Sequence, residues 1–297
     1  TLTPNLMSAK YNVAIVGITS VVGETVLSLL AEREFPVANL YALDSTGSAG
    51  GRMEFRDTYV RLQNVADFDF SQAHLAFFCA GEGSAALHAP RAAAAGCIVI
   101  DDSAQFRDEA DVPLAVPEVN AHVIADYRKR RIIANPNSCV TLLLTALKAI
   151  HDAAGIERIN VATYQAVSGT GKAAMDELAE QTTSIFNMKG ITSKVYPKQI
   201  AFNALPVIGE TTDNGYTHEE MKMLRETRKI LEDETIRVNA TCVRVPVFFG
   251  HSLAVHIETR EKITAAAARR LLEKSPGVKV IDRAKAGAFP TAVTEAA

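Results

Sequence analysis

Short, uninterrupted apolar runs alternate with amphipathic segments along the first half of the chain. The runs are rich in valine, isoleucine, leucine and alanine, which is typical of strands buried on both faces of a sheet. Between the first two runs, Val22, Val26 and Leu29 recur at helical spacing. Strands that alternate with helices in this way predict an α/β fold with a doubly wound parallel sheet. The predicted strands are residues 12–16, 40–43, 74–80, 97–101 and 131–134, and the predicted helices are residues 21–32 and 84–95.

The pattern changes in the second half, where two long apolar strands, residues 237–249 and 252–258, are separated only by a glycine–histidine pair. Strands without an intervening helix predict an antiparallel or mixed sheet. We therefore divide the chain into a first domain, residues 1–134, and a second, α+β domain, residues 135–297. The other elements predicted here are strands at 158–165 and 278–281, helices at 142–150, 172–188, 216–231 and 265–274, and a loop at 168–171.

Composition narrows the class of protein. The chain has 297 residues, of which 48% are hydrophobic and 22% charged, as expected for a soluble protein of two domains. A net charge of −3 gives no reason to expect a nucleic acid or a membrane surface as partner, and no apolar run is long enough to span a bilayer. The four cysteines are far apart and form no CxxC pair, which favours reduced thiols of a cytoplasmic protein over disulfides or a metal site. Residues 1–10 are expected to be a leader or a disordered start.

A glycine-bounded turn follows the first predicted strand. Gly17 and Gly23 flank a tight passage from strand to helix, which places backbone N–H groups where a pyrophosphate can bind. Ser20 stands in place of the middle glycine of such a fingerprint, so a plain βα turn is an alternative. After the second strand, Asp44 could accept from a ribose 2′-hydroxyl and would repel a 2′-phosphate, whereas Arg52 could do the opposite. A solvated hairpin loop is the alternative there.

A cysteine lies at a strand-to-helix corner early in the second half. The strand at 131–134 leads into Asn-Pro-Asn at 135–137, and Cys139 precedes a run of helix formers at 142–150. Unpaired N–H groups and the helix dipole at a helix start favour a thiolate, which is a strong nucleophile. The alternative is a small apolar residue buried under the helix.

Two arginines are candidates for binding an anion. Arg107 follows the strand that ends at Asp101, and ligands bind outside the carboxyl ends of such strands. A solvated loop arginine is the alternative interpretation. Arg244 lies between Val243 and Val245 in an apolar strand, where a buried guanidinium needs an anionic partner.

Six segments of the chain occur together in one order. They are residues 134–137, 163–169, 197–203, 219–222, 243–247 and 250–252. On these segments the chain, from about Val13 to its C-terminus, resembles the aspartate-β-semialdehyde dehydrogenases of the bacterial type. The resemblance implies a Rossmann-like, dinucleotide-binding first domain and a second domain that carries catalysis and dimerisation. Members of the family usually continue past this chain's last residue with a segment that returns to the first domain, so we expect that segment to be absent here.

The resemblance implies a reaction, the reductive dephosphorylation of L-aspartyl-4-phosphate to L-aspartate 4-semialdehyde by NADPH. It belongs to lysine (diaminopimelate), threonine and methionine biosynthesis. A thiolate attacks the acyl phosphate, phosphate leaves, and a hydride reduces the thioester. The family's catalytic residues match His251 as the acid or base for the thiohemiacetal and Gln165, which positions the acyl intermediate, and we assign the role of the nucleophile to Cys139. The implied partners are the substrate, phosphate and a second copy of the chain in a homodimer.

The resemblance also assigns binding residues. Arg244 matches the residue that clamps the substrate carboxylate, a task suited to a bidentate guanidinium. Glu219 and Lys222 match substrate contacts but equally fit a solvated helix pair. The substrate-binding residues are Arg244, Arg107, Asn137, Glu219 and Lys222, and the residues for NADP are Gly17, Thr19, Ser20, Val21, Val22, Gly23, Ser45, Ser168 and Gly169.

Arg244 and His251 pose a geometric problem. They are separated by an odd number of positions, so a flat strand would point them to opposite faces. Pro246 and Gly250 must break the alternation if both side chains reach one site. We predict a bend or bulge between them, and a regular strand would contradict a shared site.

Four positions depart from the family pattern. Ser20 replaces a glycine, Gly47 replaces the arginine that meets the 2′-phosphate of NADP, and Asp102 replaces an asparagine. The fourth is that Ser138 stands where the family has its cysteine, with Cys139 following. One step at a helix start rotates a side chain by roughly 100°. Either the turn bulges by one residue and delivers Cys139, or the site holds a weakly nucleophilic serine. We predict Cys139 as the nucleophile because the histidine, arginine and glutamine are otherwise in place.

Two other functions fit some of the same residues. The four departures motivate a non-catalytic or altered paralogue of the family. An N-acetylglutamyl-phosphate reductase shares the acyl-phosphate chemistry, but the segments 164–169 and 250–252 fit the aspartyl enzyme better. Asp44 and Gly47 weaken the case for NADP, which the family pattern supports.

Overall fold

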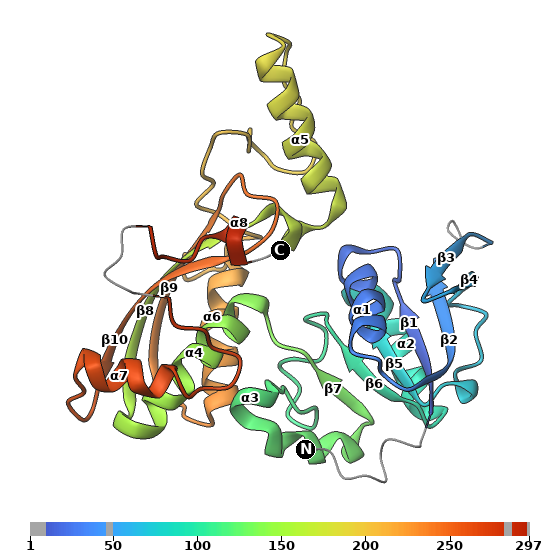
Figure 1. Cartoon of the computed structure of the whole chain (residues 1–297), viewed down its shortest axis with the longest axis horizontal. Coiled ribbons are helices and arrows are strands. Elements are labelled where there is room, and N and C mark those ends of the chain that lie inside the picture. Colours follow the sequence, from blue (N-terminus) through green and yellow to red (C-terminus); the bar gives the residue numbers. More distant parts are fainter. Residues whose placement is uncertain (1–9, 46–49, 282–286, 296–297) are drawn as a thin grey trace. The chain divides into compact units, whose positions relative to one another are not determined.

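The computed structural model describes residues 10–45, 50–281 and 287–295, and its elements form two units (Figure 1). The first unit comprises residues 1–115 and 121–136, and the second comprises residues 116–120 and 137–297. The main division therefore falls two residues beyond the boundary predicted from the sequence. Gly47 lies outside the described residues. No helix of the described ranges is both long and apolar enough to cross a membrane.

A seven-stranded sheet forms the middle of the first unit, with the strand order β3-β4-β2-β1-β5-β6-β7. Its strands are β1 (Tyr11–Val16), β2 (Val37–Asp44), β3 (Arg52–Phe55), β4 (Thr58–Asn64), β5 (Leu75–Phe78), β6 (Ile98–Asp101) and β7 (Ile132–Ala134). Its helices are α1 (Val21–Glu32), α2 (Glu82–Ala94) and the 3₁₀ helices η3 (Phe70–Gln72) and η4 (Ala121–Lys129). All neighbouring strands are parallel except β3 and β4, which are antiparallel.

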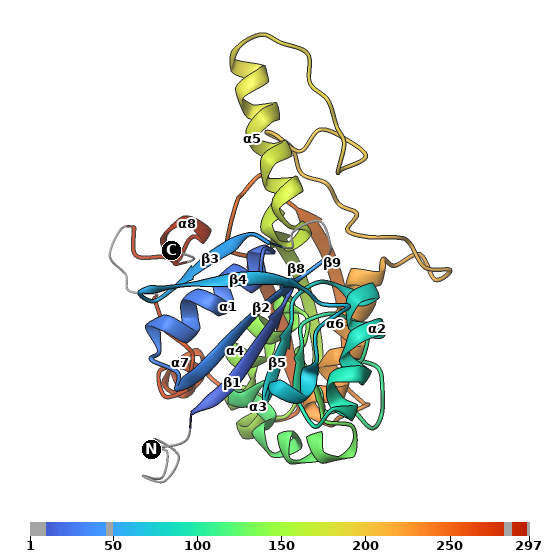
Figure 2. The same ribbon diagram turned by 90° about the vertical axis from the view of Figure 1, so that its right-hand side faces the viewer.

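The sheet is wound in two directions from β1. The chain passes through α1 to β2 on one side, and later through α2 from β5 to β6 on the other. Right-handed crossovers in opposite directions put the two helices on opposite faces, as Figure 2 shows. The doubly wound sheet predicted from the sequence is thus confirmed. The β3–β4 hairpin was not predicted, although Met53 and Phe55 alternate with polar residues and pack into the core beside α1.

The second unit holds a three-stranded sheet of order β10-β8-β9. Its elements are α3 (Pro117–Asn120), α4 (Ser138–Ala154), β8 (Ile156–Gln165), the 3₁₀ helix η5 (Val167–Thr170), α5 (Lys172–Phe186), α6 (His218–Leu231), β9 (Arg237–Arg244), β10 (Ser252–Thr259), α7 (Ala265–Leu272) and α8 (Ala292–Glu295). Because β10 is antiparallel and β9 parallel to β8, the sheet is mixed, as predicted. Helices α4 and α6 pack on it, while α5 extends away from it (Figure 1).

One strand predicted from the sequence is too long, and another does not form. β9 ends at Arg244 instead of residue 249, because Pro246 has no N–H group for a ladder and the chain bends away from the sheet. The apolar run at 278–281 pairs with no described strand, so its alternation does not form a strand. The loop predicted at 168–171 is mostly the 3₁₀ helix η5, and the other predicted helices and strands exist, with ends that move by a few residues. The largest shift is at α4, which begins at Ser138 rather than residue 142.

Candidate active site

One edge of the second sheet collects three of the candidate side chains. Gln165 is the last residue of β8 and pairs with Arg244, the last residue of β9. His251 immediately precedes β10, whose first residue, Ser252, pairs with Tyr164 of β8. Since β8 and β9 are parallel and β10 runs the opposite way, these three positions meet at the same edge. The mixed sheet therefore brings together residues that are far apart in the sequence.

The start of α4 is held by Asn137, which is the N-cap of the helix. Its Oδ1 atom accepts from the backbone N–H of Cys139 at 2.9 Å and of Val140 at 3.4 Å. Its Nδ2 atom donates to Oε1 of Glu219 at 2.8 Å, and its backbone N–H donates to Oε2 of Glu226 at 2.6 Å. Asn137 thus links the start of α4 to two glutamates of α6. Glu226 was not predicted as a site residue, although its spacing of two helical turns from Glu219 places both on one face of α6.

Glu219 is the centre of a hydrogen-bonded group in the first turn of α6. Besides the bond from Asn137, its Oε1 atom accepts from Nε2 of Gln165 at 3.1 Å, and its Oε2 atom lies 3.6 Å from Nζ of Lys222. Thr163 fixes the amide of Gln165 by donating to its Oε1 atom at 2.9 Å. Burial acts to raise the pKa of Glu219, but the bond from Asn137, the charge of Lys222 and the bond from Gln165 together lower it. Glu219 is therefore an ionised acceptor at neutral pH.

Arg244 and His251 converge on Gly169 of η5. A Cβ atom built on Gly169 would lie 3.1 Å from Nη1 of Arg244 and 3.5 Å from Nε2 of His251. The segment between the two residues is irregular, and Gly250 has a φ of +85°. The predicted bend is confirmed, and it directs both side chains to one place. The absence of a side chain at Gly169 keeps that place open.

The guanidinium of Arg244 is buried, and its charge acts on that of Glu219 without a salt bridge between them. Arg244 is 5% exposed, and its Nη1 atom donates to the backbone carbonyl of Ala166 at 2.6 Å. Its Nε atom has no hydrogen-bond partner, and it forms no ion pair with an acidic side chain of the described residues. A buried cation in this state favours an anionic ligand.

The hydrogen bonding of His251 sets its tautomer. Nδ1 accepts from the backbone N–H of Ala166 at 3.0 Å, so the proton of the neutral ring is on Nε2. Burial and then the charge of Arg244 lower the pKa of His251, and the opposing charge of Glu219 does not offset them. The ring is neutral at pH 7 and presents Nε2–H beside Gly169.

The environment of Cys139 contradicts the thiolate that we expected there. Cys139 is fully buried, whereas Ser138, the first residue of α4, is exposed. Burial and then the charges of Glu219 and Cys242 raise the pKa of the Cys139 thiol, and Arg244 and a hydrogen bond with Ser138 oppose them only partly. The N–H groups expected to stabilise a thiolate are already bonded to Asn137. The charges of Glu219 and Arg244 act on Cys139, but its raised pKa keeps it a neutral thiol.

The glycine turn of the first unit has the tight geometry of a phosphate-binding turn. Gly17 has a φ of +77°, and a Cβ atom on Gly23 would lie 2.2 Å from the carbonyl oxygen of Gly17, so neither position accepts a larger residue. Ser20 is the N-cap of α1, where its Oγ atom accepts from the N–H of Gly23 at 3.0 Å and donates to the carbonyl of Cys79 at 2.9 Å. The serine that replaces the middle glycine therefore stabilises the helix start.

The remaining residues predicted to bind the dinucleotide, and Arg107, lie in both units. Val21 and Val22 open α1, and Thr19 and Ser45 both bond to Asp44 at the end of β2. Ser168 and Gly169 belong to η5 of the second unit. Arg107 belongs to the first unit, where its Nη2 atom donates to the carbonyl of Asp102 at 2.7 Å. Asp102 in turn accepts from Nδ2 of Asn135 at 2.7 Å.

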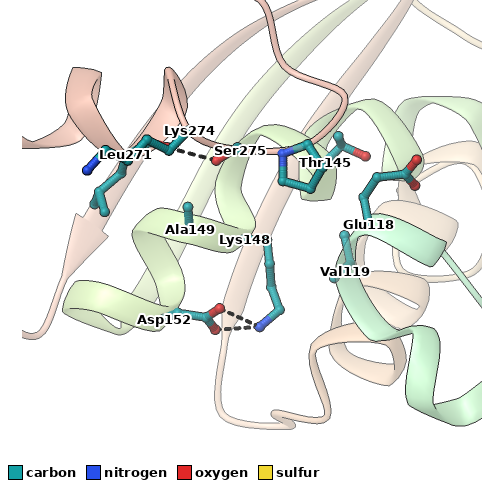
Figure 3. A pocket seen from close by; sticks show the side chains of 10 residues that line it. Glu118, Val119, Thr145, Lys148, Ala149, Asp152, Leu271, Lys274 and Ser275 are labelled. Atoms are coloured by element: carbon teal, nitrogen blue, oxygen red, sulfur yellow. Dashed lines mark hydrogen bonds and ion pairs between the residues drawn. The ribbon is translucent and has the colours of Figure 1, made fainter. Parts of the chain in front are cut away.

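A surface depression of about 430 Å³ lies elsewhere on the second unit, between α3, α4 and the end of α7 (Figure 3). Lys148 and Asp152, which line it, are paired to each other at 2.7 Å. None of the candidate residues lines this depression, so it gives no support for a catalytic role there. Within the described ranges, no three His, Cys, Asp or Glu side chains are grouped so that they could hold a metal ion.

Comparison with known families places both units. The family described as "Semialdehyde dehydrogenase, NAD binding domain" matches residues 12–127, and "Semialdehyde dehydrogenase, dimerisation domain" matches residues 147–297. An aspartate-semialdehyde dehydrogenase of Legionella pneumophila is 53% identical over 98% of this chain and 84% of its own length.

Solved structures that resemble the chain are also aspartate-semialdehyde dehydrogenases. Aspartate semialdehyde dehydrogenase II of Vibrio cholerae, in a structure described as complexed with ASA, has a TM-score of 0.95 at 52% identity, over 97% of this chain and 85% of its own. A probable aspartate-semialdehyde dehydrogenase of Pseudomonas aeruginosa has a TM-score of 0.90 at 34% identity, with the same shares covered. A Candida albicans enzyme solved with NADP is 22% identical over 90% of this chain and 76% of its own, with a TM-score of 0.66, and is alike in fold alone.

Proposed function

The chain belongs to the aspartate-semialdehyde dehydrogenase family, and on that premise we propose that it converts L-aspartyl-4-phosphate into L-aspartate 4-semialdehyde and phosphate. The hydride comes from a nicotinamide dinucleotide, for which the resemblance implies NADP. The observation that carries the proposal is the convergence of Gln165, Glu219, Arg244 and His251 beside the start of α4. The reaction serves lysine, threonine and methionine biosynthesis in the cytoplasm, and the second unit forms a homodimer.

The buried charges of Arg244 and Glu219 bind the two charged groups of a zwitterionic substrate. Arg244, a buried cation without a salt bridge among the described residues, binds the α-carboxylate, because a desolvated guanidinium gains most from a carboxylate partner. Glu219 carries the opposite charge and binds the α-ammonium group. Gln165 is fixed by Thr163 and Glu219, so its amide holds the acyl group without rotating. Arg107 binds the phosphate.

His251 acts on the oxygen of the tetrahedral intermediate. The bond from Ala166 places its proton on Nε2, and its lowered pKa keeps the ring neutral. A neutral imidazole stabilises a developing oxyanion by donating this hydrogen bond, and it can pass the proton to the oxygen when the thiohemiacetal forms.

Cys139 remains the proposed nucleophile. Its thiolate attacks the acyl phosphate, and phosphate leaves with the bonding pair. Hydride transfer to the resulting thioester gives a tetrahedral intermediate, whose C–S bond breaks to release the aldehyde and restore the thiolate. The burial of Cys139 adds a condition, because substrate must reach the thiol and the thiol must lose its proton. The positive charge of Arg244 and the hydrogen bond from Ser138 both favour the thiolate.

The same burial favours a second candidate function. With Ser138 exposed at the helix start and Cys139 enclosed, the chain is an altered paralogue that binds the ligands of the family but turns over slowly or not at all. A serine hydroxyl is a weak nucleophile unless a base activates it. Restoring the family order of the two residues separates the two candidates.

The deciding experiment measures phosphate-dependent reduction of the dinucleotide with L-aspartate 4-semialdehyde. We expect Cys139→Ser to lose at least roughly a thousandfold of kcat and Ser138→Ala to stay within about threefold of the parent chain. Thermal unfolding of each variant checks the fold.

The exchanged double variant, Ser138→Cys with Cys139→Ser, is the matched control for the paralogue. An inactive parent chain that gains activity on this exchange would establish the second candidate. Full activity in the Cys139→Ser variant would refute Cys139 as nucleophile.

A further inference from the structure

We infer that Asp44 makes the dinucleotide site of this chain prefer NAD to NADP. The inference rests on the proposed function, from which it takes the nicotinamide dinucleotide, and it departs from the NADP that the resemblance implies. It concerns only the first unit, so it is independent of which residue is the nucleophile.

Asp44 occupies the place from which a dinucleotide fold reads the adenosine ribose. It is the last residue of β2, and β2 is the parallel neighbour of β1, which leads into the glycine turn. An acidic residue roughly twenty positions after the last glycine of such a turn accepts from the ribose 2′-hydroxyl. Asp44 follows Gly23 at that spacing.

The carboxylate is held toward the glycine turn. Its Oδ2 atom accepts from the backbone N–H of Thr19 at 3.2 Å and also from the Thr19 hydroxyl. Its Oδ1 atom accepts from the N–H of Ser45 at 2.7 Å. A carboxylate has about four acceptor positions, so these three bonds leave room for one more donor. The 2′-hydroxyl of NAD supplies such a donor.

The charge of Asp44 is not compensated nearby. The residue is half-buried, and no basic side chain of the described residues forms an ion pair with it. A 2′-phosphate in place of the hydroxyl would bring a second anion against the carboxylate and would offer it no donor. The site therefore gains a charge-assisted hydrogen bond with NAD and meets like-charge repulsion with NADP.

Arg52 and Arg61 are the cations that oppose this preference. They face each other across the β3–β4 hairpin, both are exposed, and neither has an acidic partner among the described residues. Asp44 does not face this hairpin pair, because its neighbour on β4 in the sheet register is Asn64. Water and salt screen exposed guanidiniums, whereas a carboxylate fixed by three bonds acts on whatever ligand lies beside it.

The test is titration calorimetry of the full chain with NAD⁺ and with NADP⁺ separately, at one ionic strength. We expect NAD⁺ to bind at least tenfold more tightly. Asp44→Asn keeps an acceptor oxygen for Thr19 but removes the charge, and we expect it to reduce the ratio of the two affinities at least tenfold. Glu54→Gln, which removes an exposed charge from β3, is the matched control and leaves the ratio unchanged.

Each outcome bears on the preference. Equal affinities, or tighter binding of NADP⁺ that is lost in Arg52→Ala, would overturn the preference and leave the proposed reaction standing. Binding of neither dinucleotide would overturn the preference together with the proposed reaction. A lower melting temperature of Asp44→Asn with an unchanged affinity ratio would assign Asp44 a structural role and overturn the inference.

Discussion

At the scale of single residues, the order of Ser138 and Cys139 decides the chemistry that α4 presents. Asn137 caps the helix and occupies the N–H groups of Cys139 and Val140, and the helical turn places Ser138 outward and Cys139 inward. The sequence correctly placed a cysteine at a helix start. It could not predict the raised pKa, because burial among Glu219 and Cys242 depends on elements far along the chain. Here desolvation raises the pKa of the thiol more than the Arg244 charge and the Ser138 hydrogen bond lower it.

The ionisation of His251 gives a prediction at the same scale. Its lowered pKa means that the neutral, donating form persists as the pH falls below the ordinary value of 6.5, so the acidic limb of kcat/KM lies below that pH. Removing the Arg244 charge raises the pKa of His251, so Arg244→Met moves the limb to higher pH. Removing the Glu219 charge lowers the pKa, and Glu219→Gln moves the limb down. Both variants also raise KM, so the measurement is the midpoint of the limb.

A variant that removes a charge far from His251 in the sequence is the control for the shift of the pH midpoint. Lys189→Met removes an exposed charge of the same unit and leaves the midpoint in place. Movement of the limb in the same direction in the Arg244 and Glu219 variants would contradict the assignment of the limb to His251.

At the scale of elements, the bend between β9 and β10 makes the site. The segment leaves the sheet after Arg244, and the N–H groups of Val167 and Ser168 donate to the carbonyls of Val247 and Phe248 at 2.9 Å and 3.1 Å. These bonds dock the bend against η5, beside Gly169. The odd spacing of Arg244 and His251 predicted that a bend must exist. Its partner, η5, became visible only in the folded chain.

Gly250 tests the contribution of the bend. Its φ of +85° costs a residue with a side chain about 1–2 kcal/mol, so Gly250→Ala strains the segment that carries His251. Gly215 also has a φ of +85°, in open space, so Gly215→Ala has the same backbone cost without moving the bend. We expect similar losses of melting temperature and a kcat at least about tenfold lower in the Gly250 variant alone. Equal activity of the two variants would show that the position of His251 does not depend on the bend.

At the scale of the whole molecule, each unit has its own sheet and its own task. The first carries the glycine turn and Asp44, and the second carries the convergent side chains and the match to a dimerisation domain. The second unit also exposes apolar side chains near the end of α5. Phe186 and Phe202 contact edge to face at 5.8 Å while remaining 75% and 63% exposed. Such exposed apolar clusters are typical of interaction surfaces.

The homodimer is tested by sedimentation. For a chain of 32.0 kDa we expect a species of about twice that mass at micromolar concentration. We propose that the exposed pair Phe186 and Phe202 lies in the dimer interface. Changing both to serine removes apolar area from it and shifts the equilibrium toward monomer by at least about tenfold in Kd. Tyr59→Ser changes an aromatic residue of the first unit that is 71% exposed, and it leaves the mass unchanged. A monomer at all concentrations would contradict the dimer.

The sequence by itself determined the elements and the family. Periodicity located α1 and the parallel strands because burial on one face, or on both, leaves a local pattern of apolar positions. The short segments around Gln165, Arg244 and His251 identified the family because they occur together in one order. The hairpin β3–β4 was not predicted because most positions of its two strands are exposed, so they form no buried apolar run.

Only the tertiary structure decided which side chains share a site and which of them are charged. The mixed order of β10, β8 and β9 brings Gln165, Arg244 and His251 to one edge, and no local pattern encodes that order. The neutral thiol of Cys139 and the ionised Glu219 have the same origin, since both pKa shifts depend on neighbours supplied by other elements. Local sequence sets backbone conformation, whereas burial and charge pairing are set by contacts between distant segments.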